Sequence, residues 1–408
     1  MNALRAVPAR AIVRAVADAA ARWADADFPP RVRLLQRIVD RTGYTEPVVE
    51  HALDQLFASL TVDALEATIA GELGALDALD DFALRAGRPR ARALAAGSVC
   101  IVSSRTTIGV AIVPAVFALC AKCDVLVKDR EDGLVRAFFS TLAEEREEFA
   151  EAARAETWEG ESDTVNLGSF DVVVAFGSDA TLTRVAFATQ GSSTRFIGFG
   201  SRASIGYVAR EELRDVAHAT TIAAGAARDL VLYETEGCLS LHALFVERGG
   251  AVDPTDFTKL VAQEVERASV EFPPGVRDAR ASARIASARN LAAFRSAAGS
   301  GSVFSDARGS YLTVLDPPVS EPPAFLPRAL AVHAVDDPGE AITYLARHEV
   351  PVEAVAIAGK RPDLRNFAIE IGAHRIARFG DLQRPPLGGN HGGRARIADF
   401  ITWITDER

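Results

Sequence analysis

Short apolar runs that alternate with amphipathic helical segments constrain the fold of this chain more than any other feature of its sequence. Four of these runs are expected to form strands, at Ser98–Ser104, Asp124–Lys128, Asp171–Phe176 and Arg195–Gly200. Parallel strands need long crossover connections, which are usually helices, so the alternation is typical of a doubly wound parallel α/β sheet. It resumes at Leu241 and predicts a second α/β domain.

Small or charged residues stand where each of the four strands ends. Ligands of doubly wound sheets bind beyond the carboxyl ends of the strands, so these positions are candidates for binding a nucleotide. No G-x-G-x-x-G fingerprint and no Walker-type loop offers another phosphate site. Taken singly, a lysine at a strand end is usually a surface residue, and Gly-Ser before a helix is usually a cap. The candidates are Ser103, Ser104, Lys128, Gly177, Ser178 and Gly200.

The region before the first of these strands has apolar residues at helical spacing, for example over Ala11–Ala19 and Val32–Val39. We therefore expect four parts along the chain. They are an N-terminal helical segment, an α/β domain that binds the nucleotide, a catalytic α/β domain and a C-terminal segment, at residues 1–65, 66–232, 233–385 and 386–408.

Composition narrows the class of protein. The chain has 408 residues, 49% of them hydrophobic, and a net charge of -10, which is ordinary for a globular protein of two or three domains and disfavours general nucleic-acid binding. Its longest apolar run, Ile108–Cys120, is too short to span a bilayer, and we find no signal peptide. We expect a cytoplasmic protein without a membrane span.

Four cysteines in a chain of this length are too few for a disulfide scaffold. Cys120 and Cys123 have CxxC spacing, but they lie in an apolar run without a second Cys/His pair nearby. We interpret them as structural and expect no metal site. Cys238 differs, because it follows Gly237 at the junction of the two α/β domains. It is a candidate nucleophile that can meet cofactor and substrate, although a free cysteine is more often a small buried residue.

In their order along the chain, these motifs resemble the aldehyde dehydrogenase superfamily. The run Cys120–Lys128 is similar to the family's strand that ends in a cofactor-binding lysine, and Phe176–Thr181 is similar to its Gly-Ser turn before a helix. Pro386–Gly393 resembles the family's terminal Pro-Phe-Gly-Gly segment. Within the superfamily, Arg195–Arg202 and Ala227–Ser240 are most similar to the long-chain fatty acyl-CoA reductases of bacterial bioluminescence.

This resemblance implies an acyl-CoA reductase that uses NADP(H), with NAD(H) as the other possibility. Cys238 would take the acyl group from acyl-CoA or another acyl thioester, and hydride transfer would then release the aldehyde. A homo-oligomer is expected. Two other functions stay open: an aldehyde dehydrogenase that works in the oxidative direction, and a non-catalytic binding module on the same scaffold.

The sequence departs from ordinary aldehyde dehydrogenases at two positions that the resemblance makes important. Their general-base glutamate would fall near Gly198, which cannot activate water, and this suits a reductase. Glu234 or Glu236 could replace that base. Their oxyanion-hole asparagine would fall near Arg105 or Thr106, so the Cys238 backbone N–H is left to supply part of the oxyanion stabilisation. His242 is interpreted as a core histidine, and His391, between glycines, as a possible site-facing residue.

Overall fold

The computed structural model describes residues 3–85, 88–105, 107–158, 165–323 and 325–408, and the chain forms two compact units. The first unit comprises Met1–Thr42, Val49–Ser201 and Pro386–Arg408. The second comprises Gly43–Val48 and Arg202–Pro385. Each has its own parallel sheet, as the alternating pattern predicted.

The sheet of the first unit has five parallel strands in the order β5-β4-β3-β6-β7. The chain runs outward from β3 through β4 to β5, and then returns to add β6 and β7 on the other side of β3. The order therefore reverses between β3 and β6, which is the topological switch point of a doubly wound sheet. The strands are β3 (Ser98–Val102), β4 (Asp124–Lys128), β5 (Ala153–Glu156), β6 (Val172–Phe176) and β7 (Arg195–Phe199).

The N-terminal helices pack on the first unit instead of forming a separate segment. Helix α1 buries Val16 and Trp23, and the Trp23 indole donates a 3.0 Å hydrogen bond to Thr141 of α6. The helices of this part of the chain are α1 (Ala9–Ala24), α2 (Pro29–Thr42), α3 (Glu46–Ala58), α4 (Val62–Leu73), α5 (Ile112–Cys120), α6 (Leu134–Glu145), α7 (Phe149–Ala152) and α8 (Asp179–Ala188).

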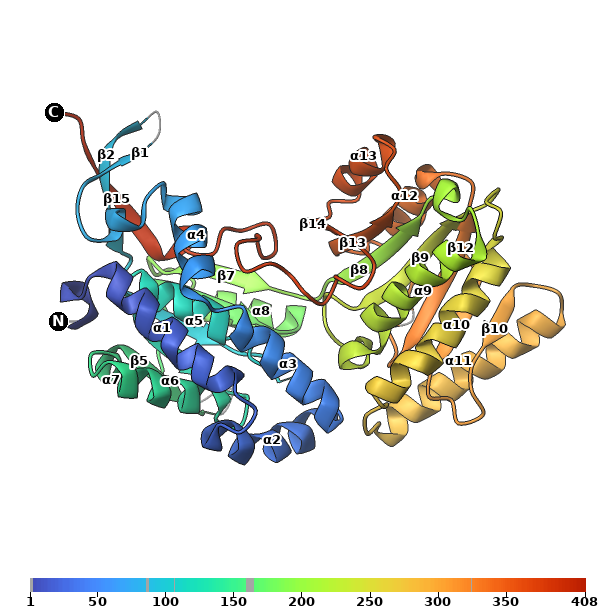
Figure 1. Cartoon of the computed structure of the whole chain (residues 1–408), viewed down its shortest axis with the longest axis horizontal. Helices are drawn as coiled ribbons and strands as arrows, with labels where there is room; N and C mark the ends of the chain where they lie inside the picture. The colour runs from blue at the N-terminus through green and yellow to red at the C-terminus, as the bar shows by residue number, and fades with distance from the viewer. Residues whose placement is uncertain (1–2, 86–87, 106, 159–164, 324) are drawn as a thin grey trace. The chain divides into compact units, whose positions relative to one another are not determined.

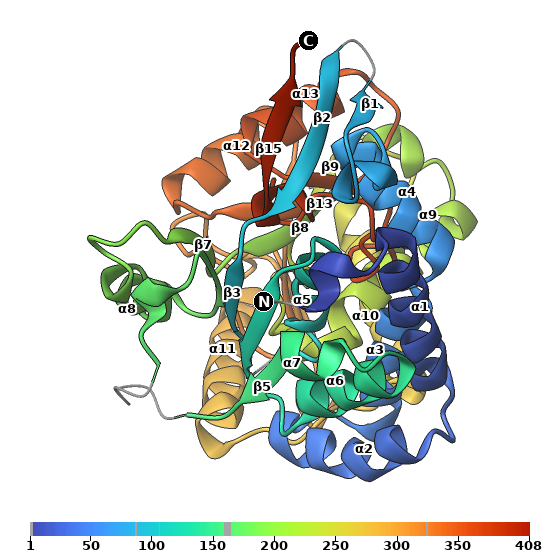
Figure 2. The same ribbon diagram turned by 90° about the vertical axis from the view of Figure 1, so that its left-hand side faces the viewer.

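The C-terminal segment also belongs to the first unit. Its last strand, β15 (Ile401–Asp406), pairs antiparallel with β2 (Arg88–Ala95), which pairs with β1 (Ala83–Arg85). Figures 1 and 2 both show the three strands side by side. This small sheet was not predicted, because Arg88–Ala95 alternates arginine and proline with alanine and lacks the usual strand formers.

The second unit is built on seven strands in the order β10-β11-β12-β9-β8-β13-β14, parallel except for β10. Helices α9 and α10 pack against each other (Figure 1), and α12 and α13 cover the sheet through Tyr344, Leu345 and Phe367. The strands are β8 (Ala203–Val208), β9 (Leu241–Glu247), β10 (Ser302–Phe304), β11 (Leu312–Leu315), β12 (Ala329–Val335), β13 (Val352–Ala358) and β14 (Arg375–Ala377). The helices are α9 (Val216–Val231), α10 (Pro254–Glu271), α11 (Ala279–Ala297), α12 (Pro338–Arg347) and α13 (Asp363–Glu370).

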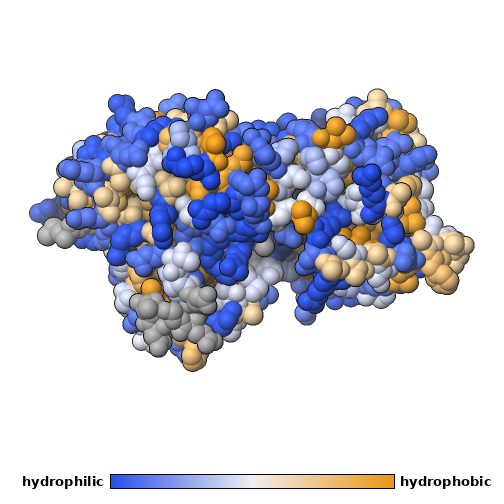
Figure 3. All heavy atoms as spheres, turned by 90° about the horizontal axis from the view of Figure 1, so that it is seen from below, coloured by the Kyte–Doolittle hydropathy of each residue, from blue (hydrophilic) through white to orange (hydrophobic). Residues whose placement is uncertain are grey.

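The boundary between the units lies before Arg202 and not at residue 233, where the sequence placed it. The reason is β8, which follows β7 after a short connection and hydrogen-bonds with β9 and β13 in the second sheet. Helix α9 therefore also belongs to the second unit. On the face drawn in Figure 3, apolar residues are scattered among hydrophilic ones and form no single extended patch.

Candidate functional site

The six candidate cofactor residues lie along one edge of the five-stranded sheet. Ser103 and Ser104 follow β3, Lys128 ends β4, Gly177 and Ser178 follow β6, and Gly200 follows β7. Because β4, β3, β6 and β7 are neighbours in that order, these ends form a row centred on the switch point. The structure thus brings the predicted residues together where a doubly wound sheet binds its ligand.

Within this row, Ser103 has a structural role. Its hydroxyl donates to the Lys128 carbonyl at 2.9 Å and accepts from the Arg130 backbone N–H at 3.0 Å, so it joins the ends of β3 and β4. It is fully buried, whereas Lys128 is half-buried, with its ammonium 5.0 Å from the ring centroid of Trp158. Among the six residues that the sequence predicted for this row, Lys128 is the one with a positive charge.

Helix α8 begins directly behind the row. The Ser178 hydroxyl caps it by accepting from the Thr181 backbone N–H at 3.4 Å. A Cβ at Gly200 would lie 2.7 Å from a carboxylate oxygen of Asp179, so a larger residue there would require the Asp179 side chain to shift. A helix amino end, two glycines and a half-buried lysine at a switch point fit the phosphates and ribose of a dinucleotide.

Three arginines add positive charge to the same edge, and the sequence analysis did not identify them as cofactor-binding residues. Arg130 is half-buried, and its pKa is lowered by burial and by the nearby charges of Arg105 and Arg184. Among the residues that the structure describes, none of the three forms an ion pair with a carboxylate. Arg105 and Arg130 follow the ends of β3 and β4, and that position was the available signal.

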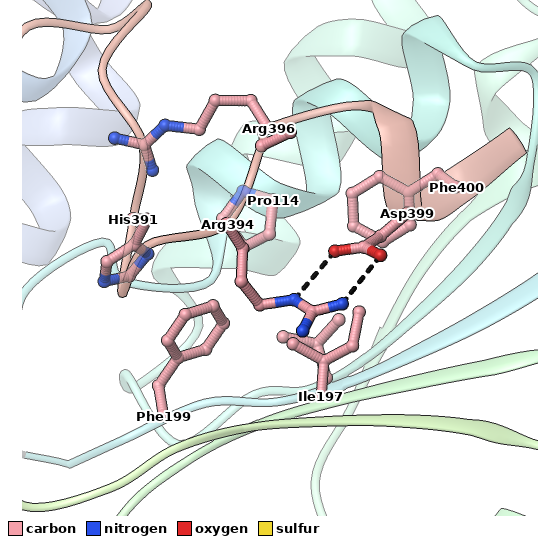
Figure 4. Close-up of a pocket in the computed structure, with 10 residues that line it drawn as sticks. Pro114, Ile197, Phe199, His391, Arg394, Arg396, Asp399 and Phe400 are labelled. Carbon is pink, nitrogen blue, oxygen red and sulfur yellow. Dashed lines mark hydrogen bonds and ion pairs between the residues drawn. The ribbon is translucent and has the colours of Figure 1, made fainter. Parts of the chain in front are cut away.

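The C-terminal segment encloses a small pocket over the other part of this sheet (Figure 4). The His391 ring stacks on Phe199 with 4.3 Å between centroids, and Phe199 stacks on Phe176 at 4.9 Å. Arg394 forms a two-bond ion pair with Asp399, at 2.9 and 2.8 Å. The pocket is small, with a volume of about 30 Å³. His391 packs against an aromatic pair here.

Cys238 lies at the amino edge of the second sheet, in the turn that leads into β9. It is half-buried, and its carbonyl accepts a 2.8 Å hydrogen bond from the Ser204 hydroxyl of β8. Burial, with a smaller contribution from the Glu353 carboxylate, raises the pKa of its thiol to about 11. The thiol is therefore protonated at neutral pH.

The turn before Cys238 has an unusual backbone. Tyr233, Glu234 and Thr235 have positive φ angles of 58°, 52° and 60°, a conformation that side chains disfavour. Glu234 secures it by ion pairs with Arg328 at 2.6 Å and Arg277 at 3.2 Å. Consecutive residues of this kind persist only where surrounding contacts enforce them, and such positions cluster at active sites.

These contacts affect the expected replacements for the missing general base. Glu234 is buried, and its carboxylate forms ion pairs with two arginines. These ion pairs hold the turn in place. The pKa of Glu236 is raised, mainly by burial and then by Glu234, and its carboxylate accepts a 3.5 Å hydrogen bond from Tyr44. Gly198 lies within β7, where an added Cβ would come 3.1 Å from the Phe196 ring. Thr106, the alternative oxyanion position to Arg105, lies outside the described residues.

His242 is a core histidine, as interpreted from the sequence. It is 5% exposed, burial lowers its pKa to about 4, and its Nε2 lies 3.1 Å from the Thr235 carbonyl. Cys238 precedes β9 and is not on that strand, so Cys238 and His242 do not share one strand face.

The other cysteines are structural. Cys100, Cys120 and Cys123 are buried, and burial raises their pKa values to about 12, 12 and 11. In the described parts of the chain, no group of three His, Cys, Asp or Glu residues is arranged to hold a metal ion. Nor does any described helix have the length and apolar character that crossing a membrane requires.

Comparison with known proteins finds a family model that matches nearly the whole chain. A family model described as acyl-CoA reductase (LuxC) matches residues 4–403. A curated relative, long-chain acyl-protein thioester reductase 2 from Photobacterium leiognathi, is 26% identical over 242 residues, 58% of this chain. The match spans 47% of that relative, about half its length.

Solved structures show the fold independently. An NAD-dependent benzaldehyde dehydrogenase from Corynebacterium glutamicum has a TM-score of 0.70 at 16% identity, covering 99% of this chain and 87% of that one. An oxidoreductase from Marinobacter aquaeolei has a TM-score of 0.73 at 12% identity, covering 98% and 85%. The expected aldehyde-dehydrogenase-like fold, with two α/β domains and N-terminal helices, is confirmed.

Proposed function

Because this chain belongs to the acyl-CoA reductase (LuxC) family, we propose that it reduces an acyl thioester to the aldehyde through an acyl group held on Cys238. The observation that carries the proposal is the setting of this cysteine. It is half-buried after a turn of three left-handed residues, whereas the other three cysteines are buried in apolar surroundings. Backbone strain of this kind, at about 1–3 kcal/mol per residue, is typical of functional sites.

In the proposed reaction the Cys238 sulfur attacks the thioester carbonyl of an acyl-CoA. The bond from the carbonyl carbon to the CoA sulfur breaks, and CoA leaves as the thiol with the proton that Cys238 gives up. The edge of the first sheet would hold a nicotinamide cofactor, whose hydride, together with one proton from solvent, would convert the resulting acyl-cysteine to a thiohemiacetal. Collapse of the thiohemiacetal releases the aldehyde and regenerates the Cys238 thiol.

We assign the cofactor to the edge that carries Lys128, Gly177, Ser178 and Gly200, and we favour NADP(H) over NAD(H). The preference is supported by Arg130 and its neighbours Arg105 and Arg184. Three arginines without a carboxylate partner among the described residues suit an additional phosphate, because guanidinium groups bind phosphate with charge-assisted hydrogen bonds.

Two features of the chain favour reduction of the acyl-enzyme over its hydrolysis. Gly198 has no side chain where the resemblance expects a water-activating glutamate, and Glu234 is bound by two arginines. Without a positioned base, hydrolysis of the intermediate is slowed by about a hundredfold or more. Glu236 is the remaining carboxyl of the turn, and the proposal requires that it does not activate water.

The oxidative alternative has one supporting observation, the similarity of the fold to aldehyde dehydrogenases. Acyl-CoAs of graded length should be incubated with NADPH or NADH while released CoA and aldehyde are measured. In parallel, an aldehyde should be supplied with NADP+ or NAD+, with and without CoA. The proposal predicts aldehyde from acyl-CoA, and an oxidative reaction that needs CoA. CoA-independent oxidation to the acid would support the alternative, and inactivity in both assays would support a binding module.

Two further parts of the proposal concern the whole protein. We propose that it is a homo-oligomer and that it works in the cytoplasm on an acyl-CoA. Light scattering on the purified chain tests the first, and fractionation of the source cells tests the second.

A further inference from the structure

Three charged or reactive residues lie at the starts of neighbouring strands, at the amino edge of the second sheet. Arg202 directly precedes β8, Cys238 lies three residues before β9, and Glu353 is the second residue of β13. In the sheet order β9-β8-β13, Arg202 precedes the middle strand. Ser204 of the same middle strand holds the Cys238 carbonyl, so the cysteine is fixed to the strand that follows Arg202.

Both outer strands are irregular at this point. The pairing of β13 with β8 shifts between Val352 and Ala354, which leaves Glu353 as the additional residue. The pairing of β9 with β8 shifts between Leu241 and Ala243, which leaves His242 as the additional residue. Bulges redirect side chains and are enriched beside active sites. Here they place two buried titratable residues on either side of the strand that follows Arg202.

Glu353 is a buried carboxylate that lies close to Arg202, which is cationic, and to His374, which is cationic when protonated. Its side chain is 6% exposed, with the Arg202 Nε at 3.6 Å and the His374 Nδ1 at 3.3 Å from the same oxygen. The His374 backbone N–H also donates to the Glu353 carbonyl at 3.0 Å. A buried carboxylate is costly unless it is paired, so this arrangement holds the Arg202 guanidinium in place.

The charges around the cysteine sulfur act in opposite directions. After burial, Glu353 is the next influence that raises the pKa of Cys238, while Arg202 and Arg375 lower it. Arg375 is engaged with the backbone carbonyls of Asp381 and Leu382. The nearby Asp229 accepts hydrogen bonds from the Gly380 and Leu382 backbone N–H groups, at 2.7 and 3.0 Å. The Arg202 side chain is 33% exposed. Among the contacts that the structure describes for Arg202, its ion partner is Glu353.

We propose that Arg202 is the cation that stabilises negative charge on the Cys238 sulfur, and that Glu353, itself held by His374, is the residue that positions Arg202. The proposal deepens the proposed function, on which it rests, because it explains how a thiol in this environment becomes a nucleophile. A positive charge beside the sulfur favours the thiolate and the negative charge that develops at the reacting centre.

Alkylation of Cys238 by iodoacetamide measures this without any substrate. The rate is followed against pH, and the adduct is located by peptide mass spectrometry. We expect Arg202→Met to slow alkylation of Cys238 by roughly three- to tenfold below the thiol pKa, since one pKa unit is a tenfold change in thiolate. Arg202→Lys should restore part of the rate. Arg248→Met, which removes an arginine beyond the opposite end of β9, is the matched control and should leave the rate unchanged.

The positioning role is tested by a double-mutant cycle. If Glu353 holds Arg202, the effect of Arg202→Met should disappear when Glu353→Ala is already present. An equal effect in both backgrounds overturns the positioning role, and no effect of Arg202→Met in the wild type overturns the whole proposal. Should Glu353→Ala not fold, the Arg202 variants still decide the first half. The pKa of Cys238 is measured whether or not the enzyme turns over, so failure of the proposed function, shown by a fully active Cys238→Ala, remains distinguishable.

Discussion

The guanidinium of Arg328 donates a 2.6 Å hydrogen bond from Nε to Oε1 of Glu234, four residues before Cys238. Arg328 is fully buried, and it also donates to the Phe272 and Pro273 carbonyls at 2.9 and 3.0 Å. Its backbone N–H donates to the Thr235 hydroxyl at 2.9 Å. One residue on the loop before β12 thus holds the left-handed turn that presents the candidate nucleophile.

Replacing this arginine should remove the support of the turn. Arg328→Met leaves Glu234 with a buried charge and one remaining arginine, and breaking a buried pair costs about 3–5 kcal/mol. We expect a loss of this size in the free energy of unfolding, measured with urea. The surface variant Arg295→Met, which breaks the exposed pair with Glu321, should cost less than about 1 kcal/mol. Equal losses in the two variants would contradict the account.

Glu247 should make the free energy of unfolding depend on pH in the acidic range. Burial alone would raise its pKa, but hydrogen bonds from Arg361, Tyr207 and Arg210 outweigh burial and lower the pKa to about 2 from 4.5. Since the folded pKa is below the unfolded value, this stabilisation is complete above about pH 4.5 and is lost as the pH falls toward 2. Glu247→Gln should unfold more easily at pH 7 and lose less stability over that window. The exposed Glu349→Gln should retain the wild-type profile, and urea unfolding at a series of pH values is the measurement.

Lys128 is expected to serve the cofactor and not the acyl group. Lys128→Met should weaken NADPH binding by about tenfold, as loss of a charge-assisted hydrogen bond of about 1.5 kcal/mol would do. Titration calorimetry gives the binding constant, and CoA release without cofactor gives the acylation rate, which should change little. Loss of acylation with intact cofactor binding would place Lys128 in the acyl site.

Arg130 separates the two cofactors. Arg130→Ala should raise the KM for NADPH by about tenfold while the KM for NADH stays within about twofold, because only NADPH carries the additional phosphate. Arg136→Ala is a suitable control, since Arg136 is occupied by the Ala155 carbonyl of β5. Equal weakening of both cofactors by Arg130→Ala would remove the basis for preferring NADP(H).

Much of the candidate site followed from the sequence because it depends on strand ends. The carboxyl end of a strand such as Asp124–Lys128 can be recognised from the sequence. Lys128 could therefore be assigned to a strand end without knowing the sheet order. The strand β8 could not be separated from β7, because only the pairing with β9 and β13 assigns it to the second unit. The boundary error at residue 233 follows from this.

The contacts around Cys238 could not be predicted from the sequence, for a related reason. Glu353 and Arg202 are 151 positions apart and meet through a sheet whose neighbouring strands come from distant parts of the chain. The bulge that redirects Glu353 is a property of strand pairing and has no signature in the run Val352–Ala358. Likewise, the left-handed turn at Glu234 is enforced by Arg277 and Arg328, and its own residue types do not favour it.

If Cys238 carries the acyl group until it is reduced, the mass of the intact protein should reveal the acyl-enzyme. The enzyme is charged with an acyl-CoA, freed of excess and followed by mass spectrometry, with Cys238→Ala in parallel. We expect one added acyl group on Cys238, none on Cys238→Ala, and an adduct that persists until NADPH is added and aldehyde appears. No adduct on Cys238, or its loss within seconds without cofactor, would contradict this expectation.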